Sequence, residues 1–192
     1  NVYPANLAWQ SPRQYAWQVG AKIADTDKDG KKEIVVAGQL NANSDDIDIY
    51  ENTGDNSYQL IYSTKYTDIH TSQSMEVADD LDNDGKMEIL IGGLTPGSNK
   101  LYMIENTANN AYQQIWSTDV IDSGMSLNLE EIKFLGDTDN DGKKEFVVGG
   151  LRPVPQLGGP LYYVFKVYEA TGNNQFKEVW SVEIYAFSIW SS

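Results

Sequence analysis

The sequence predicts an all-β fold made of three copies of one four-stranded unit. An acidic nine-residue segment occurs three times, and its copies start 55 and 57 residues apart. Each copy is followed by an apolar, β-branched run and then by a segment in which polar and apolar residues alternate with the period of a β-strand. Helical periodicity of useful length is absent from the sequence. Together these observations indicate a β-rich repeat protein.

The similarity between the copies extends well beyond the acidic segments. An element of the type Tyr-Glu-Asn-Thr recurs at residues 50–53, 104–107 and 168–171. A second element, with an aromatic residue just before a final Ser, recurs at 58–63, 112–117 and 176–181, and residues 6–11 carry a partial fourth copy of it. We therefore predict one domain over residues 1–192, with repeats at about 12–64, 65–118 and 119–182 and flanking strands at 5–11 and 183–192.

Each repeat is expected to form four antiparallel strands, which in the second repeat are about 74–78, 87–92, 100–105 and 111–117. The second of these is apolar almost throughout, as in strands buried on both faces, and turn-forming residues fill 106–110. Such units predict a β-propeller-like array of three blades. Since propellers have about 4–8 blades, the array is open or part of a larger ring. Its uncovered faces predict self-association or further blades.

The acidic segments predict metal sites. Each has Asp at positions 1, 3 and 5, Gly at 6, Lys at 7 and Glu at 9. Alternating carboxylates direct oxygens inward around a hard cation, Gly permits the sharp turn, and the residue at position 7 can offer its carbonyl. We expect about three Ca²⁺ ions, one per repeat. The expected ligands are Asp25, Asp27, Asp29, Lys31 and Glu33; Asp80, Asp82, Asp84, Lys86 and Glu88; and Asp137, Asp139, Asp141, Lys143 and Glu145.

Two other kinds of loop have a similar concentration of acidic residues. An EF-hand loop begins similarly but needs an acid at position 12 and a helix after it. Position 12 is Val36, Ile91 or Val148, inside an apolar run, which excludes an EF-hand. The other interpretation is an acidic turn without metal. It is disfavoured because four carboxylates within nine residues repel one another unless a cation lies among them.

The loop and the strand that follows it resemble a known family. Residues 24–38, 78–93 and 136–150 carry a pattern similar to the FG-GAP or VCBS repeat of integrin-α-type β-propellers. The resemblance implies that the loop joins the first two strands of a blade and holds one calcium ion. It also implies binding or adhesion as the usual role. The Phe-Gly dipeptide is absent, and Glu stands at position 9 where integrins have Asp, which favours the VCBS-like group.

Composition limits the classes of function. The net charge of −14 argues against binding of nucleic acid or an anionic membrane through a basic face, and three bound dications would reduce it to −8. The chain has no cysteine, which excludes disulfides and thiolate sites. No apolar run approaches the roughly 20 residues that span a bilayer, so membrane insertion is not expected. Calcium loops and a start without Met predict a secreted or cell-surface protein, either processed or part of a longer chain.

Residues outside the loops are weak candidates for catalysis. His70 is the single histidine and has no carboxylate arranged to orient it. The adjacent acids at 45–46 and 130–131 fit solvated charges better than acid–base pairs. We therefore expect no enzymatic activity. The alternative is a part, catalytic or not, of a secreted polysaccharide lyase or hydrolase built on a propeller.

Recognition is expected where the repeat is irregular. The irregular segments are 39–46, 94–99 and 151–160 between second and third strands, and 64–73 and 118–128 between repeats. By strand alternation they lie on the face opposite the metal loops. A protein or carbohydrate ligand is expected there, with Arg152 and the loop 154–159 as leading contacts. The recurring aromatics Trp9, Tyr62, Trp116 and Trp180 are expected to pack between blades rather than to form a sugar-binding platform.

Overall fold

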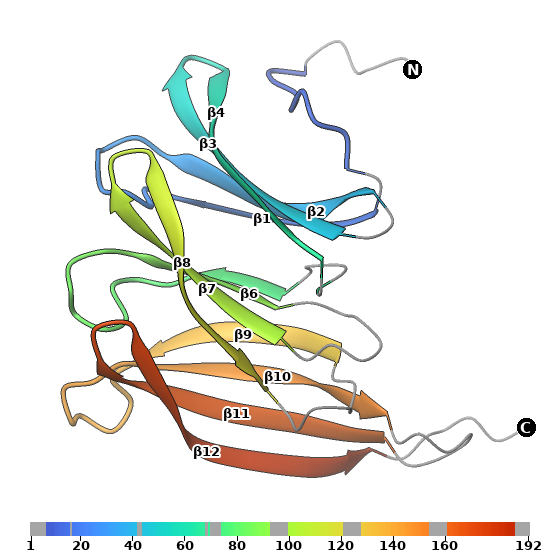
Figure 1. Ribbon diagram of the computed structural model, residues 1–192, viewed down its shortest axis with the longest axis vertical. Coiled ribbons are helices and arrows are strands. Elements are labelled where there is room, and N and C mark those ends of the chain that lie inside the picture. Colours follow the sequence, from blue (N-terminus) through green and yellow to red (C-terminus); the bar gives the residue numbers. More distant parts are fainter. Residues whose placement is uncertain are drawn as a thin grey trace, which may run out of the picture.

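The computed structural model describes residues 7–15, 17–41, 44–67, 69, 74–92, 100–120, 128–153 and 161–186. These residues form twelve β-strands and no helix, and the strands pair in chain order into three antiparallel four-stranded sheets. The prediction of three four-stranded all-β units is thereby confirmed. Figure 1 shows the three sheets one after another along the molecule. Among the described residues there is no helix that could cross a membrane.

The sheets are named in chain order. Sheet 1 contains β1 (Trp17–Ala24), β2 (Glu33–Asn41), β3 (Ser44–Gly54) and β4 (Ser57–Tyr66). Sheet 2 contains β5 (Ser74–Val77), β6 (Glu88–Gly92), β7 (Lys100–Ala108) and β8 (Ala111–Asp119). Sheet 3 contains β9 (Asn128–Gly136), β10 (Glu145–Pro153), β11 (Leu161–Gly172) and β12 (Gln175–Ala186).

The hairpins between third and fourth strands are tighter than the sequence suggested. β7 and β8 stay paired from the Lys100–Asp119 end to Ala108 and Ala111, so only two residues form the turn. The second turn residue of each hairpin is an asparagine with a left-handed backbone, at φ 53° for Asn56, 58° for Asn110 and 56° for Asn174. Asparagine tolerates this conformation better than most residues, which is why the strands can run directly into a two-residue turn.

The strands also extend into segments that the sequence assigned to loops. β2 reaches Asn41, β4 reaches Tyr66 and β10 reaches Pro153. β12 continues to Ala186 because Leu161 at the start of β11 pairs with it, so residues 183–186 belong to sheet 3. Residues 7–11 form no strand. His70, residues 94–99 and residues 154–160 lie outside the described residues.

The core consists of two apolar layers between the sheets. Side chains from β2 and β3 of sheet 1 and from β6 and β7 of sheet 2 form the first layer, which includes Val35, Ile47, Ile49, Ile89 and Ile104. The other face of sheet 2 packs on sheet 3 and forms the second layer, which includes Leu90, Leu101, Met103, Phe146 and Val148. Because successive side chains of a strand point to opposite faces, the apolar β6 serves both layers.

The first strands of the three sheets face one another. Glu76 of β5 accepts ion pairs at 3.2 Å from Lys22 of β1 and from Lys133 of β9. The β1–β2, β5–β6 and β9–β10 loops consequently lie along one edge of the molecule, together with the three hairpin turns (Figure 1). The described chain ends lie toward the opposite edge (Figure 1). The fold therefore gathers all three acidic loops on one side.

Candidate metal centre

The three acidic loops share one backbone conformation. The residue at position 4 has a left-handed backbone in each loop, with φ 61° at Lys28, 64° at Asn83 and 64° at Asn140. The glycine at position 6 has φ 93°, 96° and 90° in the three copies. A side chain at position 6 would be strained at these angles, which explains the glycine in each copy. The sequence prediction of a sharp turn at this position is confirmed.

Within each loop the aspartates accept backbone hydrogen bonds. In the second loop Asp80 Oδ2 accepts from the Gly85 N–H at 2.9 Å. Asp82 Oδ1 accepts from Asp84 at 3.2 Å, and Asp84 Oδ1 accepts from Lys86 at 3.0 Å. The first and third loops repeat the same three bonds. These bonds occupy one side of each carboxylate and hold the loop closed around its acidic centre.

The glutamate at position 9 is the buried member of each loop. Glu33, Glu88 and Glu145 are 0%, 0% and 3% exposed. One oxygen of each accepts the backbone N–H of position 2, at 2.5 Å from Thr26, 2.5 Å from Leu81 and 2.7 Å from Thr138. The glutamate thus ties the start of the second strand to the start of the loop, and its other oxygen is left for a further partner.

Several buried carboxylate oxygens have no hydrogen-bond partner among the described residues. In the acidic loops they are Oε1 of all three position-9 glutamates and Oδ1 of Asp25 and Asp80. An unpaired buried acceptor costs about 1–3 kcal/mol, and a charged one costs more. In the third loop oxygens of Asp137, Asp139, Asp141 and Glu145 lie within 4.8 Å of one another, and the three aspartates of each other loop do the same. An oxygen-only set of this kind fits a hard divalent cation such as Ca²⁺.

The electrostatics of the loops reflect this concentration of negative charge. Burial raises the pKa of Glu88 to about 8, with a further contribution from the neighbouring Asp82 and Asp80 carboxylates. Burial likewise raises the pKa of Glu33. The charged form of these two glutamates is therefore disfavoured unless a positive charge is nearby.

A second set of acids was missed by the sequence reasoning. Glu51, Glu105 and Glu169 lie on the third strands, directly opposite the position-9 glutamates in the strand register. Each accepts an ion pair from the position-7 lysine, at 2.9 Å from Lys31, 2.8 Å from Lys86 and 2.8 Å from Lys143. Hydrogen bonds to Glu51 and Asp29 raise the pKa of the Lys31 ammonium. The recurrent Glu of the Tyr-Glu-Asn-Thr element was the signal that could have identified them.

The position-7 lysines also pair with the position-5 aspartates, at 3.2 Å in the first loop, 2.8 Å in the second and 2.7 Å in the third. Their ammonium groups therefore neutralise part of the loop charge. The sequence assigned these residues a role through their backbone carbonyls, and that role stays a prediction.

The first two loops are bonded to the hairpin of the next sheet. Asp27 Oδ2 accepts from the Asn110 N–H at 2.7 Å, and Asp29 Oδ2 accepts from Asn109 Nδ2 at 2.9 Å. The second loop repeats this arrangement with sheet 3: Asp82 accepts from the Asn174 N–H at 2.5 Å, and Asp84 from Asn173 Nδ2 at 2.9 Å. For the third loop the described residues supply no such hairpin. The acidic loops therefore also act as junctions between sheets.

Arg152 and most of the recurring aromatic residues are held by contacts within the fold. Arg152 pairs with Glu183 at 2.5 Å and lies 5.0 Å above the Tyr162 ring, so its guanidinium is engaged by its own sheet. Tyr62 packs on Tyr112, and Trp116 packs on Phe146, Tyr168 and Phe176, as expected for residues between blades. Trp180 differs, because it is 52% exposed on the outer sheet.

Comparison with known proteins agrees with this architecture. A family model described as FG-GAP-like repeat matches residues 25–91 and 80–148, which together span more than half of the chain. Among solved structures, the C-terminal domain of PilY1 from Pseudomonas aeruginosa matches with a TM-score of 0.50 and 18% identity. That match covers 76% of this chain and 29% of the PilY1 chain, so it supports the fold alone. A search of curated proteins returned no match.

The two family matches cover all three acidic loops completely, and the second match ends at Val148 in the buried second strand of sheet 3. Together with the three four-stranded sheets, it supports a β-propeller-like repeat fold. The chain belongs to the FG-GAP-like repeat family.

Proposed function

We propose that this protein is a calcium-stabilised propeller module for binding, adhesion or self-assembly outside the cell, in which calcium is structural. The observation that carries the proposal is the set of buried carboxylate oxygens without hydrogen-bond partners, which includes the position-9 glutamate in all three loops and the position-1 aspartate in the first two. A hard cation is the partner that satisfies several such oxygens at once. Calcium is abundant outside cells, which supports the extracellular part of the proposal.

In this proposal the aspartates at positions 1, 3 and 5 and the glutamate at position 9 hold the ion, with the carbonyl at position 7. When bound, the ion supplies the positive charge that the loop needs to remain compact. Asp27 and Asp82 each bond the next sheet through their second oxygen, so ordering the loop also orders the junction. The role of the metal is therefore stabilisation, and we propose no catalytic role for it.

The partner-binding surface is proposed on the edge opposite the acidic loops, for a protein or a carbohydrate. In this proposal structural ions occupy the acidic loops. The opposite edge is the one where the connections between strands differ in length from repeat to repeat. Arg152 lies near it at the end of β10, but its pairing with Glu183 makes it part of the scaffold. The ligand is therefore expected to contact the connections between strands rather than this guanidinium.

Thermal unfolding in calcium and in chelator tests the metal proposal. At a free calcium concentration of 100 times Kd, one site stabilises the folded protein by about 2.7 kcal/mol, and three independent sites by about 8 kcal/mol. For a chain of this size each kcal/mol shifts Tm by about 2–4 °C. Glu88→Gln should remove about one third of the calcium-dependent shift, whereas Asp55→Ala, at an exposed acid in a hairpin turn, should leave it intact. Equal Tm values in calcium and chelator would refute calcium binding.

A further inference from the structure

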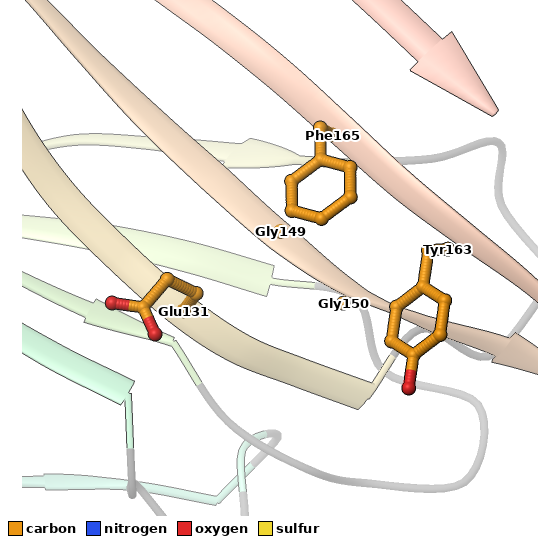
Figure 2. A pocket seen from close by; sticks show the side chains of 5 residues that line it. All are labelled: Glu131, Gly149, Gly150, Tyr163 and Phe165. Carbon is orange, nitrogen blue, oxygen red and sulfur yellow. The ribbon is translucent and has the colours of Figure 1, made fainter. Parts of the chain in front are cut away.

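One face of sheet 3 is apolar, and no sheet of the described residues packs against it; it is called the uncovered face below. Trp180 and Ile184 of β12 are each 52% exposed, and Tyr163 of β11, which pairs with Ile184, is 39% exposed. Beside them lies a cavity of about 230 Å³ lined by Glu131, Gly149, Gly150, Tyr163 and Phe165 (Figure 2). The corresponding faces of sheets 1 and 2 are covered by the next sheet. A large exposed apolar face of this kind marks an interaction site.

The junction between sheets 2 and 3 shows what fills the equivalent cavity. Gly92 of β6 occupies the same place as Gly149 of β10, and a Cβ added there would meet Leu129 Cδ1 of sheet 3 at 2.6 Å. Leu129, which belongs to the first strand of sheet 3, therefore packs directly on the Gly92 backbone. The space over Gly149 in Figure 2 has the position that the first strand of a following blade would fill.

Both internal junctions use the same three contacts. An aromatic residue of the fourth strand packs on the next sheet, as in Tyr62 on Tyr112 and Trp116 on Phe176, with ring centroids 5.4 Å apart in both pairs. A hairpin turn donates to the acidic loop before it. Opposite charges meet along the first strands. On its uncovered face sheet 3 has the residues for the same three contacts: the aromatic Trp180, the acidic loop 137–145 and the first-strand Lys133. The partner that fits this face is therefore a further blade.

A second copy of this chain does not fit, because the matching face of sheet 1 is already covered. Trp9 packs on Tyr50 at 5.4 Å and on Tyr58 at 4.9 Å. Trp116 makes the same contacts with the equivalent Tyr168 at 5.8 Å and Phe176 at 5.4 Å. Residues 7–11 therefore occupy the position of the fourth strand of a preceding blade, and their sequence is a copy of that element. The β12 strand of a second copy would need the same space.

The segment that covers sheet 1 is also anchored by polar contacts. Ser11 shares a hydrogen bond of 2.9 Å with the Tyr50 hydroxyl. Arg13 and Tyr15 both donate to Asp48, whose side chain is fully buried. Removing this segment would leave a buried carboxylate without its cation, which is strongly unfavourable. It is therefore held in place and would not be displaced by a weakly bound second copy.

Charge also opposes a second copy. In a head-to-tail pair, Lys133 of one copy would face Lys22 of the other, since these residues occupy equivalent positions with Glu76 between them. The turn residue Asp55 would take the place of Asn109, which donates to Asp29. Asp55 has no proton to donate and would meet Asp141 with like charge.

We propose that the uncovered face of sheet 3 receives a further blade that is not a copy of this chain. That blade carries an acid at the first-strand position of Glu76, an Asn-Asn turn in its outer hairpin, and a tyrosine facing Thr138. The tyrosine follows from the first junction, where the Thr26 and Tyr112 hydroxyls lie 2.7 Å apart. Sheet 2 of this chain meets all three requirements. The inference rests on the propeller part of the proposed function and not on calcium binding.

The experiment joins a second copy of residues 65–120 after Ser192 of the full chain. Because the chain has no cysteine, Tyr163→Cys places a single thiol on the uncovered face. Gln59→Cys, on an exposed position of β4, is the matched control. A second fusion carries Glu76→Lys and Asn109→Asp in the appended repeat only. Thiol labelling rates are measured for both fusions and for the unfused chain, and sedimentation of the unfused chain is followed across a dilution series.

We expect the unaltered appended repeat to slow labelling at Tyr163→Cys at least about tenfold, and the altered repeat to leave it near the unfused rate. Labelling at Gln59→Cys should be the same in all three proteins, and the unfused chain should sediment as a monomer. Equal protection by both repeats, protection by neither, or a discrete dimer of the unfused chain that protects Tyr163→Cys would overturn the inference. If protection persists in chelator and Tm is equal in calcium and chelator, calcium binding is refuted and the inference of a further blade stands.

Discussion

Asp82 and Asp139 occupy the same position in two copies of the acidic loop, but their surroundings differ. Asp82 accepts the Asn174 N–H of sheet 3 at 2.5 Å. Within the described residues Asp139 has only the bond inside its own loop, from the Asp141 N–H at 3.2 Å. We therefore expect Asp82→Ala to destabilise the metal-free protein more than Asp139→Ala does.

The size of the difference follows from one bond. A hydrogen bond to a charged acceptor contributes about 1.5–3 kcal/mol, and partial exposure of Asp82 places it near the lower value. The bond inside the loop is lost in both variants and cancels. About 1.5 kcal/mol corresponds to a Tm difference of roughly 3–6 °C in a chain of this size.

Thermal and urea unfolding in chelator measure this difference directly. Asp27→Ala provides a second junction residue, since Asp27 accepts the Asn110 N–H at 2.7 Å, and it should resemble Asp82→Ala. In saturating calcium all three variants should additionally lose about one site's stabilisation. Equal losses for Asp82→Ala and Asp139→Ala in chelator would show that the loops do not join the sheets.

Four further substitutions test the packing and charge at the junctions and on the uncovered face. Gly92→Ala forces a Cβ against Leu129 between sheets 2 and 3 and should lower the free energy of unfolding in urea by about 1–3 kcal/mol. Gly149→Ala places its Cβ against Phe165 on the uncovered face and should cost less than about 1 kcal/mol, because that ring can move outward. Tyr112→Phe should cost about 1 kcal/mol through loss of the bond to Thr26; the equivalent Phe176 shows that the ring itself fits. Glu76→Gln should lower the free energy of unfolding by about 0.5–1 kcal/mol in low salt and by almost nothing in about 1 M salt, and a salt-independent loss would contradict an ion-pair role.

The conformation of the acidic loops was predictable because it depends on residues that are close in sequence. Gly30, Gly85 and Gly142 adopt the left-handed backbone that the D-x-D-x-D-G pattern implies. The prediction that the loops are not EF-hands was correct, because the residues after the position-9 glutamate lie in a buried β-strand and not in a helix. Local spacing was sufficient for these conclusions.

The glutamates of the third strands were not predictable from spacing in the same way. Glu105 is 17 residues beyond Glu88 in the chain and comes opposite to it only through the register of β6 and β7. Trp180 shows the converse case. Its sequence resembles that of Trp116, yet Trp116 contacts sheet 3 and Trp180 is half exposed because the described residues place no sheet against it.

The sequence by itself determined the class of the fold, the number of repeats and the composition of the loops, because each depends on patterns within one repeat. Only the tertiary structure decided that the loops bond neighbouring sheets, that charge alternates from Lys22 to Glu76 to Lys133, and that residues 7–11 pack on sheet 1 as the fourth strand of one sheet packs on the next. Those properties arise where segments distant in the chain pack together, between residues about 40 or more positions apart. The pattern within a repeat carries no information about which partner a face will meet.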